Sequence, residues 1–378
     1  MGAMQIDPVA LTQQLVRLDT RNPPGHELDC IVLVADLLAG HGFDTAIQEF
    51  GPKRANLVAR IKPRSGSVKP IMFTGHVDTV PFGHADWSYD PLGAEIVEGR
   101  LYGRGSSDMK AGVAAIVAAA IAEIEFLRET SGVTIVITGG EETGCEGASA
   151  LVADRMLGET GLLVVAEPTA NEMLAGHKGA LWMKACCHGR AAHGAMPHLG
   201  DNAIYRIADA ALKLKAFEFN ETRHPVMGQA TLNVGTVGGG ANINSVPDYA
   251  ELTIDVRTLP GMRHDKVLDQ LAFTLGVDCE LAPLVDLAAV WTDPVRPEMR
   301  RFQHSHFAAT GFAADIKTAN YFTDASILTP ALGNIDTVIC GPGEPSMAHK
   351  TDEYCEVARI AEACQIYRMA IKSYSEQL

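Results

Sequence analysis

The stretch PIMFTGHVD at residues 70–78 joins a short apolar run directly to His76 and Asp78. A uniformly apolar run of this length is typical of a strand that is covered on both faces of a parallel sheet. In open α/β sheets, ligands bind at the edge where the strands end. The stretch therefore predicts an α/β fold that carries its functional residues at the carboxyl edge of the sheet.

Two further apolar runs end in the same way. VTIVITGG at 133–140 leads into Glu141 and Glu142, and GLLVVA at 161–166 leads into Glu167. Three strands would thus bring imidazole and carboxylate groups to one edge of one sheet. Zinc binds these groups, and a catalytic zinc site keeps one position open for water. The sequence therefore predicts a metal centre of the kind found in zinc hydrolases.

The first half of the chain alternates helix and strand signals. Capped or glycine-terminated apolar patterns predict helices, and short β-branched runs predict strands. The expected helices are 7–20, 28–43 and an alanine-rich segment after residue 110, and the expected strands are 56–61, 70–75, 133–139 and 162–166. This order is typical of a doubly wound, mostly parallel α/β sheet.

After Gly179 the pattern changes to β-α-β-β-α-β, the order of a split ferredoxin-like unit. The expected strands are 181–189, 230–240, 250–259 and 278–287, and the helices are 201–214 and 264–275. We expect a catalytic domain of residues 1–179 and 292–378, with an inserted dimerisation domain at 180–291. Helices near 293–310 and at 352–376 would complete the larger domain.

Composition narrows the class of protein. The chain has 378 residues, of which 47% are apolar and 20% charged, and its net charge of −15 argues against nucleic acid or an anionic membrane as partner. The longest apolar segment, 111–124, is too short to span a bilayer. The eight cysteines form no CxxC pair, so we expect reduced thiols and, with no signal peptide recognised, a cytoplasmic protein.

Five motifs together resemble a known family. They are GHVDTVP at 75–81, GRGSSDMKAG at 103–112, EETG at 141–144, AEPT at 166–169 and HKTDEY at 349–354. From about residue 7 onward, the chain resembles the two-zinc amidohydrolase and exopeptidase family of acetylornithine deacetylase, succinyl-diaminopimelate desuccinylase, aminoacylase and carboxypeptidase G. HKG at 177–179 and RTLPG at 257–261 resemble the acetylornithine deacetylase branch. The resemblance also implies a cis peptide between Asp108 and Met109.

The resemblance implies two zinc ions per subunit. His76, Asp108 and Glu167 would bind one ion, and Asp108, Glu142 and His349 the other. Metals about 3.5–4 Å apart need a carboxylate that reaches both, and Asp108, at the turn into a helix, is best placed for this. Cobalt or manganese could replace zinc.

Two acidic residues are expected to support the metals without binding them. Asp78 would accept the free ring N–H of His76 and fix its tautomer; a solvated turn aspartate is the alternative. Glu141 would be the general base, because neighbours on an extended chain point in opposite directions and Glu142 is the ligand. The alternative for Glu141 is a solvent-facing loop residue.

The resemblance implies further residues that contact substrate. His193 would donate to the developing oxyanion in the partner subunit of a homodimer, and Arg257 would clamp a carboxylate, with Asn242 nearby. Gly341 and Gly343 could present backbone amides to the substrate. The alternatives are a surface histidine, an exposed strand-end charge and a plain turn.

These residues predict hydrolysis of an N-acyl amino acid by a zinc-bridged water, with Glu141 as general base. A dipeptidase or carboxypeptidase on the same scaffold is the alternative, and a metal-free binding protein a distant one. A hydride-transfer enzyme is disfavoured because Asp108 stands where a dinucleotide loop needs its third glycine or alanine.

Overall fold

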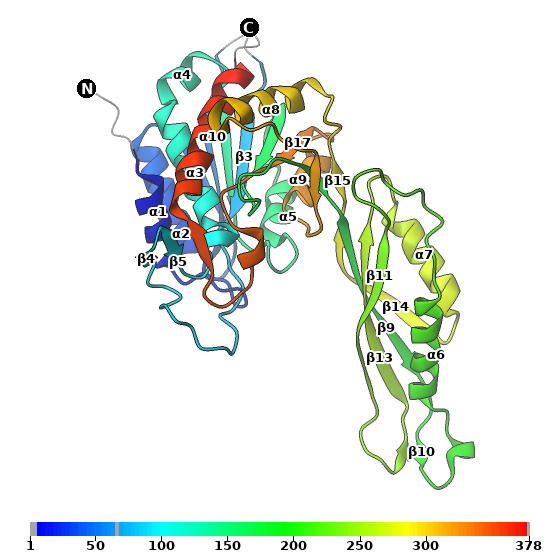
Figure 1. Cartoon of the computed structure of the whole chain (residues 1–378). Helices are drawn as coiled ribbons and strands as arrows, with labels where there is room; N and C mark the ends of the chain where they lie inside the picture. The colour runs from blue at the N-terminus through cyan, green and yellow to red at the C-terminus, as the bar shows by residue number, and fades with distance from the viewer. Residues whose placement is uncertain (1–5, 65–67, 376–378) are drawn as a thin grey trace. The chain divides into compact units, whose positions relative to one another are not determined.

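The computed structural model describes residues 6–64 and 68–375, which form two compact units (Figure 1). The larger unit contains the chain up to Gly176, the segment Trp291–Lys317 and the chain from Thr323 onward. The smaller unit contains His177–Val290 together with Thr318–Phe322. The five residues 318–322 therefore belong with the smaller unit, although the sequence analysis assigned them to the larger one.

The larger unit is built on a mixed sheet whose central strands are parallel. Its strands, in spatial order, are β1 (Asp44–Gly51), β2 (Arg54–Ile61), β6 (Val133–Thr138), β3 (Ile71–His76), β7 (Leu162–Val165), β17 (Asp336–Ile339), β8 (Leu174–His177) and β15 (Val290–Trp291). Strand β16 (Lys317–Ala319) pairs with β8 and contains the point where the chain passes from the larger unit into the segment 318–322. Strands β6, β3, β7 and β17 run parallel. This confirms the expected fold class, and it makes the three strands that precede the predicted ligands direct neighbours.

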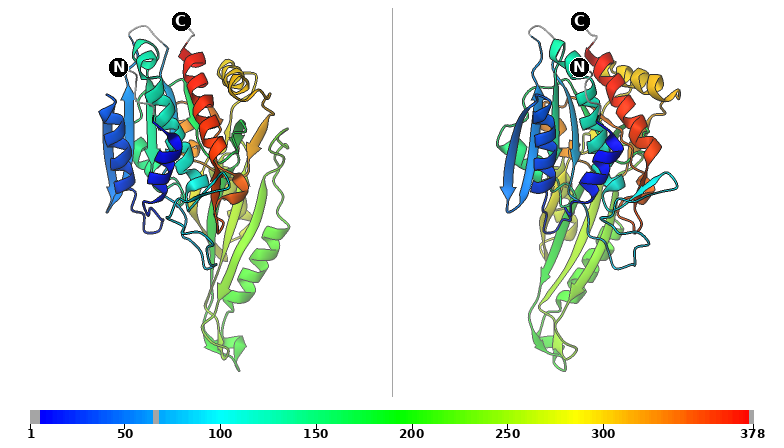
Figure 2. Two further views of the ribbon diagram at one scale, coloured as in Figure 1. Left: turned by 60° about the vertical axis from the view of Figure 1, so that its left-hand side comes forward. Right: turned by 90° about the vertical axis from the view of Figure 1, so that its left-hand side faces the viewer.

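Helices cover both faces of this sheet. One face and six helices share a single buried apolar cluster, and the helices are α1 (Pro8–Val16), α2 (Leu28–Gly40), α3 (Ala111–Ala122), α4 (Ile124–Glu129), α8 (Pro297–Thr310) and α10 (Val357–Ser375). Figure 2 shows α10, in red, on the face of the sheet that these helices cover. Helices α5 (Glu146–Ala153) and α9 (Ala325–Ala331) pack on each other and on strands of the sheet outside that cluster. Among the described residues, no helix combines the length and apolar character that a bilayer crossing requires.

The chain after residue 351 differs from the prediction. Tyr354–Glu356 forms strand β18, which pairs with β5 (Arg100–Tyr102), and β5 in turn pairs with β4 (Ile96–Val97). The C-terminal helix therefore begins at Val357 and not at 352. The short helix α4 (Ile124–Glu129) follows α3. The last residue of the predicted helix, 376, lies outside the described residues.

The smaller unit has the predicted ferredoxin-like arrangement. Its main elements are β9 (Gly179–His188), α6 (Ala203–Lys215), β11 (Thr231–Gly239), β13 (Tyr249–Thr258), α7 (His264–Leu275) and β14 (Cys279–Leu287). The sheet order is β11-β13-β9-β14, and every pairing is antiparallel. Both helices bury their apolar faces against the same side of the sheet. A short pair, β10 (Ala192–His193) and β12 (Ser245–Val246), extends the unit.

The prediction that all cysteines are reduced is wrong for one pair. Cys187 in β9 and Cys279 in β14 are directly opposite each other and form a disulfide. Their separation of 92 residues carries no spacing signal, so only the strand register brings them together. The remaining cysteines of the described chain are free thiols: Cys30, Cys145, Cys186, Cys340, Cys355 and Cys364.

A glycine allows helix α3 to approach the end of β7. A Cβ atom on Gly112 would lie 2.2 Å from the backbone oxygen of Ala166, the residue before Glu167. Such a contact is far inside van der Waals distance, so the helix would have to move away. A Cβ atom on Gly40, the last residue of α2, would instead meet no atom within 4 Å apart from its chain neighbours and the backbone of its own helix.

We predict opposite effects from the same substitution at these two glycines. Gly112→Ala should lower the free energy of unfolding by about 1–3 kcal/mol, the usual cost of overpacking. Gly40→Ala should leave it unchanged or raise it by up to about 1 kcal/mol, because alanine is the better helix former. Urea denaturation measures both. Equal stability of the two variants would show that α3 is not held close to Ala166.

Candidate metal centre

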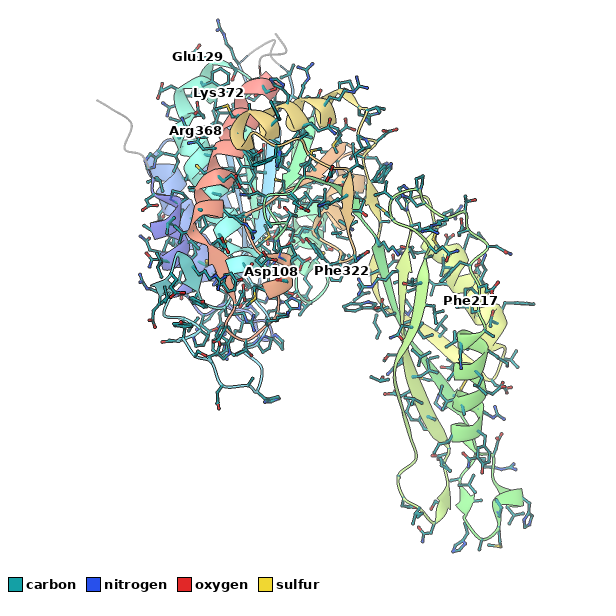
Figure 3. The ribbon with its side chains drawn as sticks, viewed as in Figure 1. Asp108, Glu129, Phe217, Phe322, Arg368 and Lys372 are labelled. Carbon is teal, nitrogen blue, oxygen red and sulfur yellow. A yellow bond between two sulfur atoms is a disulfide. The ribbon has the colours of Figure 1, made fainter. Side chains whose placement is uncertain are left out.

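The parallel strands bring the predicted ligands to one edge of the sheet. His76 is the last residue of β3, the Glu141–Glu142 pair follows β6, and Glu167 follows β7 after one residue. His76 is in register with Thr138, the last residue of β6. Figure 3 shows Asp108 at the opposite end of the larger unit from Arg368 and Lys372 of α10. The convergence follows directly from strand order and direction.

Asp108 lies between two histidines that come from distant parts of the chain. Its Oδ1 atom is 3.3 Å from Nε2 of His76, and its Oδ2 atom is 3.5 Å from Nε2 of His349. Glu167 approaches the first histidine, with 3.9 Å between Oε1 and Nε2 of His76. The second histidine lies 3.0 Å from Oε2 of Glu142. Two groups of three side chains thus share Asp108.

The donor atoms fit metal ions of the size of zinc. One ligand atom from each of His76, Asp108 and Glu142 lies within 4.8 Å of the others. Within the described chain, Oε1 of Glu142 is buried and has no hydrogen-bond partner, although a buried carboxylate oxygen normally has one. Two imidazoles and several carboxylates form a donor set that zinc binds. The site therefore qualifies as a candidate metal site.

The electrostatics of the site favour the binding of a cation. Burial raises the pKa of Glu141 and of Glu167 well above the ordinary value, and the neighbouring carboxylates add to this effect although His76 opposes it. Burial, followed by the charge of Asp108, also raises the pKa of Glu142. Burial alone would lower the pKa of His76, but its hydrogen bonds to Asp108 and Asp78 raise it well above its usual range. Carboxylates crowded in this way are stabilised as anions by a bound divalent cation.

Asp78 is fully buried and links the end of β3 to the end of β6 by hydrogen bonds. The Nδ1 atom of His76 lies 2.9 Å from the backbone oxygen of Asp78 and 3.4 Å from its Oδ1 atom, so the main chain makes the shorter contact. The carboxylate accepts the backbone N–H groups of Glu141 and Glu142, each at 3.2 Å, and the side-chain amide of Asn22. Asp78 therefore orients the glutamate pair as well as the histidine, a role that its spacing did not predict.

The two glycines predicted to bind substrate are tightly packed. The backbone N–H of Gly341 donates to Oγ1 of Thr169, so this amide is already used within the protein. A Cβ atom on Gly341 would lie 2.1 Å from the backbone oxygen of Ala166, and one on Gly343 would lie 2.0 Å from that of Ser107. These contacts explain both glycines by packing, and for Gly341 they conflict with substrate binding through its amide.

The other predicted substrate residues belong to the smaller unit. His193 is exposed in β10, and its Nδ1 atom accepts the backbone N–H of Ala195. Asn242 is exposed in the loop after β11. Arg257, in β13, lies 2.9 Å from Oδ1 of Asp255, so its guanidinium already has one carboxylate partner.

Two buried acids beside the site were not predicted from the sequence. Asp324, at the start of α9, is fully enclosed, and burial raises its pKa to about 6. Glu353 binds the backbone of the loop that carries Asp108. Glu353 lies inside the HKTDEY motif, where only His349 received a role. No local pattern marks Asp324, because the segment FTDAS resembles any helix start.

Comparison with known proteins agrees with this geometry. The model of Peptidase family M20/M25/M40 matches residues 72–373. A Staphylococcus epidermidis protein named probable succinyl-diaminopimelate desuccinylase is 30% identical over 410 residues, covering 98% of each chain. An M20 metallo-carboxypeptidase from Sulfolobus solfataricus has a TM-score of 0.81 at 16% identity, over 98% of this chain and 100% of its own. A Bacillus subtilis M20 peptidase described as dinuclear metal-binding has a TM-score of 0.73 at 13% identity, over 98% of both chains.

The structural neighbours share the fold, and the family match covers most of the chain. The curated relative carries a desuccinylase name, so the resemblance to the acetylornithine deacetylase branch stays a prediction. The motifs, the strand order and the family match agree. The chain belongs to Peptidase family M20/M25/M40 and is an amide-bond hydrolase.

Proposed function

We propose that the protein hydrolyses the amide bond of an N-acyl amino acid with two zinc ions per subunit. The observation that carries this proposal is the placement of the Asp108 carboxylate, with one oxygen toward His76 and the other toward His349. His76, Asp108 and Glu167 would hold one ion, and Asp108, Glu142 and His349 the other. Cobalt or manganese would fit the same nitrogen and oxygen donors.

The reaction then needs a proton acceptor close to the metals. Bound zinc would act as a Lewis acid and lower the pKa of a water molecule to about 7. Glu141 would take the proton of this water as its oxygen attacks the acyl carbon, and would pass it to the nitrogen as the C–N bond breaks. Geometry supports this role, because Oε2 of Glu141 lies 4.0 Å from Nε2 of the proposed ligand His76, and a general base must lie within reach of the proton that it takes.

The substrate class rests on the residues of the smaller unit and on the relatives. Arg257, with Asn242, would bind the carboxylate of the amino acid, and His193 would donate to the oxyanion. The desuccinylase name of a relative with 30% identity supports an N-acyl amino acid over a simple amide. Gly343 stays a weaker candidate for substrate contact. A cytoplasmic location would suit a small metabolic substrate.

A substrate panel tests the proposal. N-acetyl and N-succinyl amino acids and dipeptides should be assayed with added zinc and again after dialysis against a chelator. We expect hydrolysis of an N-acyl amino acid that is lost on metal removal, and a lower kcat for His193→Ala. Activity on dipeptides alone would identify a dipeptidase. Full activity without metal would contradict the proposed chemistry.

The two neighbouring glutamates should respond differently to the same change. Glu141→Gln should keep its metal content and lose about 10²–10⁴-fold in kcat, the usual contribution of general acid–base catalysis. Glu142→Gln should lose metal as well, because it removes a charged ligand. Metal content by mass spectrometry and kcat on the best substrate measure both effects. Metal loss in Glu141→Gln with metal retained in Glu142→Gln would mean that base and ligand are interchanged, and equal loss in both variants would mean that Glu141 is itself a ligand.

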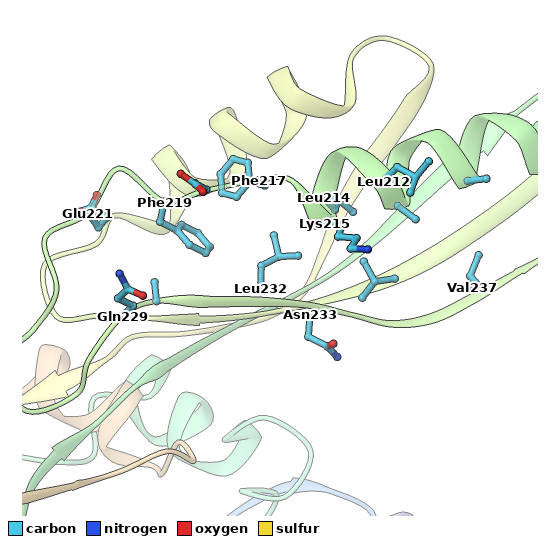
Figure 4. A pocket seen from close by; sticks show the side chains of 15 residues that line it. Leu212, Leu214, Lys215, Phe217, Phe219, Glu221, Gln229, Leu232, Asn233 and Val237 are labelled. Atoms are coloured by element: carbon cyan, nitrogen blue, oxygen red, sulfur yellow. The ribbon is translucent and has the colours of Figure 1, made fainter.

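We also propose that the smaller unit forms a homodimer through β11. This strand is at the edge of its sheet, and an uncovered edge strand invites pairing with another chain. Between β11 and α6 lies a groove of about 990 Å³ (Figure 4), and its apolar rim includes Val237 and Leu212, which are 65% and 66% exposed. Lys215 and Glu218 lie in the same groove. A second copy related by two-fold symmetry would pair opposite charges and cover the apolar rim.

Two valines in the smaller unit provide a matched test of this interface. Val237→Asp should shift the protein toward monomer, because it buries a charge at the proposed contact. Val277→Asp should have no effect, since Val277 is fully exposed between α7 and β14, at the opposite edge of the sheet. Analytical ultracentrifugation measures the mass of each variant. A wild-type monomer, or a Val237→Asp dimer as stable as wild type, would exclude the proposed interface.

A further inference from the structure

The loop that carries Asp108 is organised around one buried carboxylate. Oε1 of Glu353 accepts the backbone N–H groups of Ser107 and Asp108, at 2.8 and 3.0 Å. Oε2 accepts the backbone N–H of Gly105 at 3.0 Å and a guanidinium N–H of Arg104 at 2.7 Å. Glu353 is completely buried. Four donors therefore meet on two oxygens that water does not reach.

The backbone of this loop is shaped to receive an anion. Gly105 has φ 82° and ψ 2°, the left-handed conformation that glycine adopts without strain. A left-handed residue next to right-handed or extended ones turns successive N–H groups toward one point and forms an anion-binding nest. Here a side chain of the protein itself occupies the nest. The direction in which the Asp108 side chain leaves the loop is thereby tied to Glu353.

The same glutamate is also connected to the second histidine. Glu353 follows His349 by four residues in one loop, and its backbone oxygen accepts the N–H of Gly103. Arg104 adds a bond from its guanidinium to the backbone oxygen of Lys350 at 3.2 Å. The His349 side chain is 55% exposed, so packing alone does not fix it. The position of His349 against Asp108 therefore depends on the link between these two segments.

We infer that Glu353 is the positioning residue that holds Asp108 and His349 in register for metal binding, an inference that rests on the proposed two-metal function. Glu353 is not among the residues proposed to hold the metals. It sets the distance between the shared carboxylate and the histidine on the far side of the site. Residues that orient metal ligands without touching the ion usually contribute about 10–100-fold to metal affinity.

Glu353→Gln is a sharp test because it changes the chemistry and keeps the shape. A glutamine offers one acceptor oxygen, and its NH₂ group would face N–H donors on the other side of the nest. We expect the affinity for Co²⁺ to fall by about 10–100-fold relative to wild type, with an altered visible absorption spectrum. Both quantities are measured by titrating metal-free protein, without any assay of activity.

A control separates positioning from general stability. Glu123→Gln also neutralises a buried carboxylate, which pairs with Arg368 and Lys372 far from Asp108 (Figure 3). It should leave cobalt affinity within about twofold of wild type, whatever happens to its Tm. A merely structural role for Glu353 would lower the Tm of the metal-free variant and leave the affinity and spectrum of the folded protein unchanged, which would overturn the inference.

A second variant keeps the test decisive if Glu353→Gln does not fold. Arg104→Gln removes one of the four bonds to Glu353 and leaves the three amides in place. We expect a smaller loss of cobalt affinity, and an unchanged affinity and spectrum would overturn the inference. If the wild-type protein binds neither cobalt nor zinc, the proposed two-metal function fails. If the wild type binds cobalt and the Glu353→Gln variant binds it equally well, only the inference about Glu353 fails.

Discussion

Crowding of carboxylates at the ends of three adjacent parallel strands is the constraint on which the structure of the site depends. Asp108, Glu141, Glu142 and Glu167 surround one histidine in a buried environment, where unpaired charge is expensive. The protein does not disperse these groups. It fixes the Glu141–Glu142 pair through backbone N–H groups, which donate to the carboxylate of Asp78. A site that concentrates negative charge in this way is organised for cations.

Much of this arrangement could be predicted from the sequence, because apolar runs that end in His76, Glu142 and Glu167 identify both the strands and the edge where they meet. The ferredoxin-like unit was also predictable from its element order. The structure adds the strand order β6-β3-β7, which makes the three ligand-bearing strands neighbours. Order within a sheet depends on long-range pairing, and no local pattern encodes it.

The features that escaped prediction share this long-range origin. The Cys187–Cys279 disulfide depends on the register of two strands, and β18 forms only because Tyr354 meets β5. Strand β17 has four residues, which is too short for a periodic signal. Glu353 was visible in the motif, but its role depends on amides 245–248 residues away in the chain.

The central claim is that the chain holds two metal ions that share Asp108. Anomalous diffraction from a crystal grown with zinc tests it most directly, because the peaks locate each ion without any assumption about activity. The account predicts two peaks about 3.5–4 Å apart, one beside His76 and Glu167 and the other beside Glu142 and His349, with Asp108 between them. A single peak, or peaks that do not contact Asp108, would contradict it.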